Sequence, residues 1–225
     1  MTQAETVMVV GSGPLGAVAA RRLAEAGRAV TILEAGPAIS DPPGSHVRNQ
    51  PRYQRDPDSF LAGITSEISY FDQSAPPRAL PGASVSAAVG GQGVLWTNNC
   101  PRPAPAERGR LLSDDEWDRY LGIAESYLGV TDDTFAGSVR QQRILQRLQP
   151  VLSAAGRSIR GQPMAGRLVD RDTIHYVATH DILAGTGVRI ETAVVRRVLL
   201  DGGRASALLL ADGATVPAAA VIVAA

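Results

Sequence analysis

The sequence has no lysine, a single cysteine and few aromatic residues (4%). One cysteine excludes an internal disulfide framework and a multi-thiolate metal site. No apolar run approaches the roughly 20 residues that span a bilayer, and the N-terminus lacks the basic region of a signal peptide. The 22 arginines balance 22 acidic residues, which removes the electrostatic drive towards nucleic acid or anionic lipid. We therefore expect a cytoplasmic protein that binds neither nucleic acid nor membrane.

The chain opens with a strand–helix–strand pattern. Residues 6–10 form a continuous apolar run, typical of a strand buried on both faces, and a glycine-rich turn follows over 11–16. A helix comes next and stops at Gly27, and a second apolar strand spans 29–33. The helical periodicity predicts one shared face for five residues: Leu15, Val18, Ala19, Leu23 and Ala26.

The glycine-rich turn matches the dinucleotide-binding fingerprint in its context. Gly11, Gly13 and Gly16 follow a strand and open a helix, and an acid, Glu34, lies 18 positions beyond Gly16. The helix N-terminus would hold a diphosphate. Glu34 would accept hydrogen bonds from both ribose hydroxyls and repel a 2′-phosphate, which disfavours NADP. The fingerprint does not separate NAD from FAD, and a glycine turn without a ligand is the alternative interpretation.

Two helices are expected in the middle of the chain. Ser113 and Glu116 have the spacing of a capping box, and the helix that they open stops at Gly129. A second helix is predicted over residues 135–149, where Pro150 should end or kink it.

The segments on either side of these helices have different patterns. Residues 37–82 are rich in Pro, Gly and Ser, and so long a segment indicates an ordered excursion or a lid. From residue 188 the hydrophobic period changes to two, which predicts a β-meander with strands at 188–191, 194–200, 205–210 and 216–224. The apolar last strand has no polar tail, so we expect part of a longer polypeptide or a chain that pairs with a second one.

Several separate stretches resemble glucose–methanol–choline oxidoreductases, and pyranose oxidases above all. The matching stretches are residues 7–36, 44–49, 53–54, 89–97, 101–102, 115–118 and 124–127. The resemblance is weakest between residues 157 and 183. It implies an α/β fold: a Rossmann-like FAD-binding domain of the glutathione-reductase type with a β-meander and inserted helices. Residues 1–225 would be the FAD-binding portion, with 37–82 as the excursion or lid, 108–155 as the helical insertion and 188–225 as the meander.

The resemblance also implies a reaction. We expect FAD-dependent oxidation of a secondary hydroxyl of a pyranose sugar or glycoside, at C2 or C3, to a ketone, with hydride transfer to flavin N5 and reoxidation by dioxygen or a quinone-like acceptor. Leu95 stands where members with covalently bound FAD carry histidine, so we expect non-covalent FAD. Thr97 matches the threonine beside flavin N5 and O4, where a hydroxyl stabilises negative charge. Two departures from the pyranose oxidases, Leu95 and the weak resemblance over residues 157–183, favour a relative that acts on glycosides, including C-glycosides.

The fingerprint and the resemblance together imply a set of FAD contacts. The candidates are Gly11, Ser12, Gly13, Pro14, Leu15, Gly16, Glu34, Ala35, Gly90, Gly91, Gly93, Leu95, Trp96, Thr97, Asn98, Val195, Ala224 and Ala225. Val195 would meet the adenine edge through its backbone, and Ala224 and Ala225 would approach the diphosphate. A flexible turn is the alternative for residues 90–93, and core packing is the alternative for Trp96.

No catalytic base and no metal site are expected in this chain. The family's catalytic His and Asn near its C-terminus have no match here, and His175 and His180 lack a third ligand with suitable spacing. His46 is expected to make a structural hydrogen bond, and Cys100 to be a small buried hydrophobe.

Two other functions stay open at this point. One is an NAD-binding dehydrogenase or regulatory Rossmann module, which would be colourless. The other is a non-catalytic FAD-binding subunit that needs a partner chain. Residues 37–82 would shape either a substrate entrance or the contact of a homo-oligomer.

Overall fold

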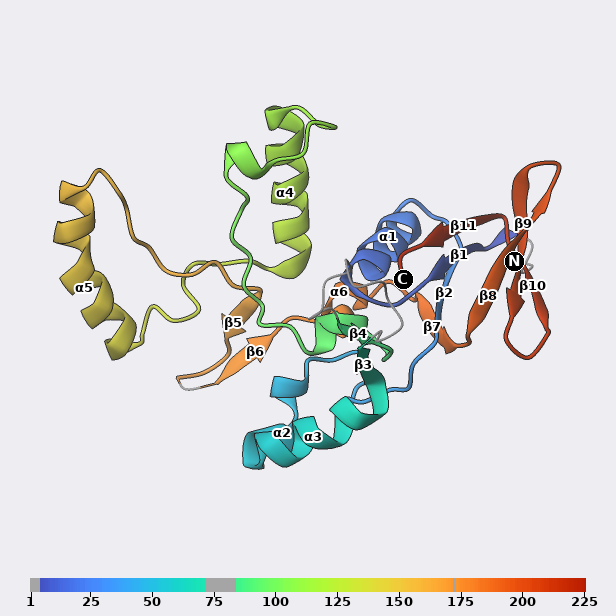
Figure 1. The fold of residues 1–225 in the computed structure, drawn as a ribbon, viewed down its shortest axis with the longest axis horizontal. Helices are drawn as coiled ribbons and strands as arrows, with labels where there is room; N and C mark the ends of the chain where they lie inside the picture. Colours follow the sequence, from blue (N-terminus) through green and yellow to red (C-terminus); the bar gives the residue numbers. More distant parts are fainter. Residues whose placement is uncertain (1–4, 72–83, 172) are drawn as a thin grey trace. The chain divides into compact units, whose positions relative to one another are not determined.

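The computed structural model describes residues 5–71, 84–171 and 173–225. The chain divides into two compact units (Figure 1). The first unit comprises Met1–Trp96 and Ala178–Ala225, and the second comprises Thr97–Val177. Two distant stretches of sequence therefore build the first unit together.

A four-stranded parallel sheet forms the centre of the first unit (Figure 1). Its strand order is β11-β1-β2-β7, and its strands are β1 (Val7–Val10), β2 (Val30–Glu34), β7 (Arg189–Thr192) and β11 (Ala220–Val223). Val9 aligns with Ile32 on one side and with Ile222 on the other. A central parallel strand that is covered on both faces has a nearly continuous apolar sequence, as residues 6–10 do.

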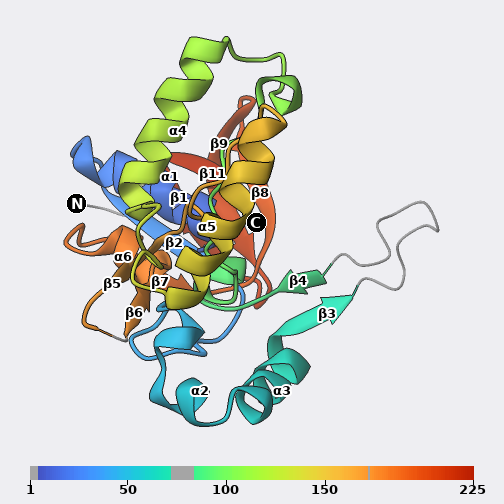
Figure 2. The same cartoon turned by 90° about the vertical axis from the view of Figure 1, so that its left-hand side faces the viewer.

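The other elements of the first unit connect or cover this sheet. They are α1 (Pro14–Glu25), η2 (Val47–Asn49), α2 (Pro51–Arg55), α3 (Pro57–Ile68), β3 (Ser69–Phe71), β4 (Ser84–Ser86), η3 (Gly91–Val94) and α6 (Thr179–Leu183). Figure 2 shows β3 leaving α3 and lying beside β4, its antiparallel partner. The described part of the predicted excursion, residues 37–71, is thus mostly helical, and the remainder of the segment up to 82 lies outside the described residues.

A three-stranded antiparallel sheet packs against one face of the parallel sheet. It consists of β8 (Val195–Asp201), β9 (Arg204–Leu210) and β10 (Thr215–Pro217), in the order β10-β9-β8. Met8 and Leu33 pack with Leu208 on this side. On the opposite face Val9 and Ile32 pack with Ala20 of α1. Neighbouring strand residues point to opposite faces of the parallel sheet. The core therefore has three layers: the antiparallel sheet, the parallel sheet and α1.

The prediction of one continuous β-meander over 188–225 is wrong in its connections. β7 pairs with β2, and the predicted strand 216–224 is two strands in two different sheets. The Ala218 amide donates to Ser206 O of the antiparallel sheet, whereas the next amide, Ala219, donates to Thr6 O at the start of the parallel sheet (both 2.9 Å). The apolar period continues through this change of sheet, so periodicity alone could not reveal it.

The five residues predicted to share one face of α1 are not its buried residues. Its buried residues are Gly16, Ala17 and Ala20, whereas Leu15 is 79% exposed. Small residues face the sheet because the helix approaches it closely. The C-terminal stop is as predicted, with Gly27 at φ +74°.

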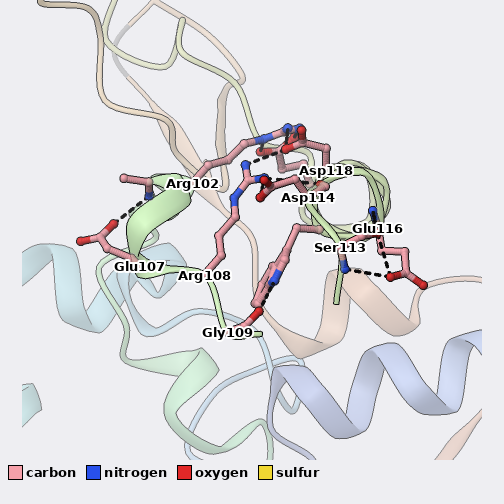
Figure 3. Close-up of polar contacts among 11 residues, drawn as sticks. Arg102, Glu107, Arg108, Gly109, Ser113, Asp114, Glu116 and Asp118 are labelled. Atoms are coloured by element: carbon pink, nitrogen blue, oxygen red, sulfur yellow. Dashed lines mark hydrogen bonds and ion pairs between the residues drawn. The ribbon is translucent and has the colours of Figure 1, made fainter. Parts of the chain in front are cut away.

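The second unit contains two long helices and a small hairpin. Its elements are η4 (Pro105–Glu107), α4 (Asp114–Leu128), α5 (Val139–Ala154), β5 (Gly166–Leu168) and β6 (Ile174–Tyr176). The predicted helical insertion, 108–155, lies within this unit. The capping box is confirmed: the Glu116 amide donates to Ser113 Oγ (3.3 Å), and the Ser113 amide donates to Glu116 Oε2 (2.9 Å; Figure 3).

Helix α5 differs from the expected bounds. It begins at Val139, after Ser138, whose hydroxyl accepts a hydrogen bond from the Gln141 amide (3.3 Å). It continues through Pro150 to Ala154. Pro150 removes one amide donor from the helix. The carbonyl that loses its partner belongs to Gln146, an exposed residue, where solvent can replace the hydrogen bond.

Polar groups hold the described segments of the second unit together. The Asn98 side chain is fully buried, and its Nδ2 donates to Ala165 O and Val177 O (both 2.8 Å). Arg108 bridges Asp114 and Asp118 of α4 at 2.9 and 2.7 Å (Figure 3). The two hydrogen bonds of Asn98 join residues 67 and 79 positions apart, which is why no local motif revealed them.

Candidate functional site: a cleft at the carboxyl ends of the parallel strands

A cleft of about 410 Å³ opens in the first unit at the carboxyl ends of the parallel strands. This edge is where open parallel sheets bind ligands, and the volume lies within the usual range for small-molecule sites. The lining residues are Val10, Gly11, Ser12, Gly13, Pro14, Leu15, Leu33, Glu34, Ala35, Ser86, Ala87, Gly91, Gln92, Ala193, Val194, Val195, Ala224 and Ala225. Eleven of the predicted FAD contacts are in this set, and they come from five separate stretches of sequence.

The turn after β1 depends on two glycines at close backbone approaches. Gly11 has φ +97°, its amide donates to Leu33 O (2.8 Å), and a Cβ there would lie 2.9 Å from Ala224 O. A Cβ on Gly16 would lie 2.0 Å from Gly11 O. Real Cβ atoms do not approach a backbone oxygen so closely, so only glycine allows α1 to start against β1. Gly16 therefore has the packing role that the fingerprint predicts, and it does not line the cleft.

The start of α1 has open space at Gly13 and amide donors without intrahelical acceptors. Gly13 is the N-cap residue without a side-chain cap, and a Cβ at this position would meet no atom within 4 Å. Pro14 has no amide hydrogen, and the amides of Leu15 and Gly16 belong to the first turn, which has no intrahelical acceptors. Such a turn attracts an anion through its donors and through the positive end of the helix dipole.

Glu34 lies at the end of β2 beside this turn and is 6% exposed. Its Oε2 accepts hydrogen bonds from the Ser12 amide (2.9 Å) and the Ser12 hydroxyl (2.5 Å), and its Oε1 accepts one from the Gly36 amide (2.9 Å). These donors compensate for the desolvation of a buried carboxylate. The acid of the fingerprint is thus fixed by the turn that precedes the helix.

The second glycine-rich stretch packs directly on the first. The Gly90 amide donates to Ser12 Oγ (2.7 Å), a Cβ on Gly91 would lie 3.1 Å from Gly13 Cα, and a Cβ on Gly93 would lie 2.7 Å from the Pro14 ring. Residues 91–94 form the short helix η3, and Gly91 and Gln92 line the cleft. The stretch is an ordered contact between two turns, which excludes the flexible-turn alternative.

The remaining predicted contacts lie outside this cleft. Gly90 and Gly93 pack beneath it, and Leu95 and Trp96 are half-buried residues after η3. Thr97 and Asn98 begin the second unit, where Thr97 is exposed and Asn98 is buried. A contact of Leu95, Trp96, Thr97 or Asn98 with a flavin stays a prediction.

The other residues singled out in the sequence have structural contacts. His46 is fully buried, its Nδ1 accepts from the Arg48 amide (3.1 Å), and its Nε2 lies 2.9 Å from Trp96 O. Because Nδ1 is an acceptor, Nε2 carries the hydrogen and donates to that carbonyl. Cys100 is half-buried, and burial raises the pKa of its thiol. The expected structural role of His46 is confirmed.

Seven cleft residues were missed by the sequence reasoning: Val10, Leu33, Ser86, Ala87, Gln92, Ala193 and Val194. Val10 and Leu33 end their strands, so the rule that ligands bind at carboxyl ends would have found them. Ser86 and Ala87 carry no local signal. They reach the cleft because the backbone at Ala87 approaches Gly36, where a Cβ would lie 2.0 Å from Ala87 C.

The comparisons with known proteins agree with this geometry. Residues 9–61 match the NAD(P)-binding Rossmann-like domain family. The chain is 33% identical to the C-glycoside 3-oxidase of Microbacterium trichothecenolyticum over 92% of this chain and 47% of that protein. It is 29% identical to the pyranose 2-oxidase of Emericella nidulans over 79% of this chain and 36% of that protein.

The chain is a homologue of these sugar oxidases. The resemblance stated from the sequence motifs is therefore confirmed. The chain spans about half the length of two C-glycoside 3-oxidases that it matches, 47% of one and 46% of the other.

Solved structures confirm the fold class. A formate oxidase variant of Aspergillus oryzae, studied for its FAD modification, superposes with a TM-score of 0.58 at 14% identity, over 99% of this chain and 46% of that chain. A pyridoxine 4-oxidase from Mesorbium loti superposes with a TM-score of 0.52 at 17% identity, over 97% and 48% of the two chains. At such identities the likeness shows the Rossmann-like architecture alone.

The residues of the cleft fit the adenosine diphosphate half of a dinucleotide. The open space at Gly13 and the first-turn amides of α1 suit a diphosphate, and Glu34 suits a ribose hydroxyl. Within residues 5–71, 84–171 and 173–225, no group of His, Cys, Asp and Glu side chains could hold a metal ion. In the same ranges no helix is both long and apolar enough to cross a bilayer.

Proposed function

We propose that this chain is the FAD-binding part of an oxidoreductase that oxidises a secondary hydroxyl of a pyranose sugar or glycoside, at C2 or C3, to a ketone. Dioxygen or a quinone-like compound would accept the electrons. The observation that carries the proposal is the single cleft that unites Gly11, Gly13 and Glu34 with the backbone of Ala224 and Ala225. The names of two relatives, C-glycoside 3-oxidase and pyranose 2-oxidase, support the substrate class.

The binding roles follow from the contacts of each residue. The amides of Leu15 and Gly16 would hold the diphosphate, because they are donors at the positive end of α1. Glu34 would hold the ribose of the adenosine. Val195 lines the cleft where β8 begins, in keeping with its expected place at the adenine edge.

Bound FAD would supply the hydride acceptor of the reaction, a chemistry that protein side chains lack. The residues that line the cleft would bind and orient that group. The family's catalytic His and Asn have no match in this sequence, so we assign none of its residues to the removal of the substrate hydroxyl proton.

A binding experiment tests this function. The purified protein should carry flavin absorbance or regain it on titration with FAD. Gly13→Ala should weaken FAD binding at least tenfold with little change in thermal stability, because the added carbon meets no protein atom but takes space in the cleft. Gly63→Ala is the matched control, since this exposed glycine of α3 has open space around it and lies outside the cleft.

The second candidate is an NAD-binding module, because residues 9–61 match a family of NAD(P)-binding Rossmann-like domains. Calorimetric titration with FAD, NAD and NADP separates the two candidates. Tighter binding of NAD than of FAD, by a colourless protein, would replace the proposal. Weak binding of NADP is expected in both cases, because Glu34 repels a 2′-phosphate.

The mode of attachment has its own test. Leu95 has no nucleophilic atom, so flavin should stay in the supernatant after acid precipitation of the protein. Flavin that remains in the pellet would contradict non-covalent binding. If the chain works only with a partner, the yellow protein alone will not bleach when glucose or a C-glucoside is added without oxygen, and the complete oxidase will.

A further inference from the structure

The buried polar network beneath the cleft limits how Glu34 can bind a ribose. We propose that Glu34 accepts a hydrogen bond from one ribose hydroxyl rather than from both, and that Ser12 is the positioning residue that imposes this limit. The proposal rests on the proposed function, because it requires an adenosine diphosphate group in the cleft. It departs from the expectation that Glu34 accepts from both ribose hydroxyls.

The first step is a count of the hydrogen-bond acceptor positions on the Glu34 carboxylate. An ionised carboxylate has about four lone-pair positions, two on each oxygen. On Glu34, Oε2 accepts from the Ser12 amide at 2.9 Å and from the Ser12 hydroxyl at 2.5 Å, which fills that oxygen. Oε1 accepts from the Gly36 amide at 2.9 Å. No other described residue donates to this carboxylate, so one position on Oε1 is left for a ligand.

The second step is that hydrogen bonds around Ser12 fix its hydroxyl and its backbone. Ser12 is fully buried, and its hydroxyl has a single proton. The Gly90 amide donates to Ser12 Oγ at 2.7 Å, so that proton is directed to Glu34 Oε2. Thr179 Oγ1 donates to the Ser12 carbonyl at 2.9 Å and fixes its backbone. Oε2 could turn to a ligand only by losing both of its hydrogen bonds from Ser12.

The third step is the consequence for the ligand. A ribose has two neighbouring hydroxyls, and only one of them can donate to the remaining position on Oε1. Loss of that hydroxyl removes a hydrogen bond to a charged acceptor, which corresponds to a loss of affinity of roughly tenfold or more. Loss of the other hydroxyl should change the affinity by no more than about twofold, because Glu34 has no position for it.

The experiment compares ADP, 2′-deoxy-ADP and 3′-deoxy-ADP by calorimetry with the purified protein freed of bound flavin. We expect one deoxy compound to bind roughly tenfold more weakly than ADP and the other to bind within about twofold of it. In Ser12→Ala the carboxylate loses a restraint and regains an acceptor position on Oε2. The two deoxy compounds should then differ by less than about threefold.

Thr179→Val is the matched control. It removes another buried hydroxyl from the same network but leaves every hydrogen bond to Glu34 in place. This variant should lose thermal stability and retain the tenfold difference between the deoxy compounds. A purely structural role of Ser12 predicts the same retained difference in Ser12→Ala, so the two roles are separated by binding and not by stability.

Each outcome bears on the proposal. Equal weakening of both deoxy compounds, or weakening of neither while ADP binds, overturns the single acceptor and leaves the proposed function standing. A failure to bind ADP, FAD or NAD overturns both. An unchanged difference in Ser12→Ala removes the positioning role of Ser12. If that variant does not fold, Ser12→Cys, a weaker donor of similar size, should show the same reduced difference.

Discussion

The two units of the chain are built by different means. In the first unit, residues from both sheets and from α1 bury one another in a three-layer core. In the second unit, neither α4 nor α5 has a fully buried residue, and large apolar side chains are exposed on both helices, among them Tyr120, Ile144 and Val151. Close backbone packing and a layered core stabilise the first unit. In the second unit the buried apolar residues Met164, Ala165 and Val177 are supplemented by helix caps, ion pairs and the buried amide of Asn98. The variants below test this difference, from the largest expected effect to the smallest.

The largest effect is expected for Gly16→Ala in the first unit. A Cβ 2.0 Å from Gly11 O forces α1 away from β1, and overpacking of this kind costs about 3 kcal/mol or more. Urea unfolding measures the loss. Gly63→Ala, in the exposed α3 helix, should instead be neutral or stabilise by about 0.5–1 kcal/mol. Equal stability of the two variants would refute the close approach of helix and strand.

In the second unit the largest effect is expected for Asn98→Ala. The substitution leaves the carbonyls of Ala165 and Val177 without their side-chain donor and puts alanine at φ +60°. The expected cost is about 2–4 kcal/mol. Hydrogen exchange should accelerate in residues 97–177 and stay unchanged in the parallel sheet. Faster exchange in β1 or β2 would show that the two units do not unfold independently.

A smaller effect is expected at the N-terminus of α4. Ser113→Ala removes the cap on the Glu116 amide, which should cost about 1 kcal/mol. Ser126→Ala is the control, because this hydroxyl donates only to Ile123 O of its own helix, and its loss should cost less than about 0.5 kcal/mol. Thermal unfolding of the two variants side by side gives the comparison.

The smallest effect concerns the ion pair between Arg102 and Glu125. The Arg102 guanidinium donates to Glu125 and lowers the pKa of that carboxyl below its ordinary value of 4.5. A lowered pKa in the folded state stabilises the protein above pH 4.5, and this contribution is lost as the pH falls through the folded-state pKa. Arg102→Gln should therefore be less stable than the parent at neutral pH and equal to it in acid. A difference that grew on acidification would contradict the pair.

Much of the first unit could be predicted from local sequence. Three of its features depend only on residues close in sequence, so each has a recognisable pattern. They are the apolar run before Gly11, the helix stop at Gly27 and the acid Glu34. The capping box of Ser113 and Glu116 was found for the same reason. The period of two after residue 188 found the strands but not their partners, because a strand looks alike in either sheet.

What the sequence by itself determined is the strand–turn–helix–strand unit and the glycines at Gly11 and Gly16, since no other residue fits those backbone geometries. The tertiary structure alone decided which side chains meet at the cleft. Ser12 reaches Glu34, Gly90 and Thr179 across 22, 78 and 167 positions, and no local pattern encodes contacts at such separations. The sequence set the binding turn, and packing between distant segments set the number of hydrogen bonds that its acid has left to offer.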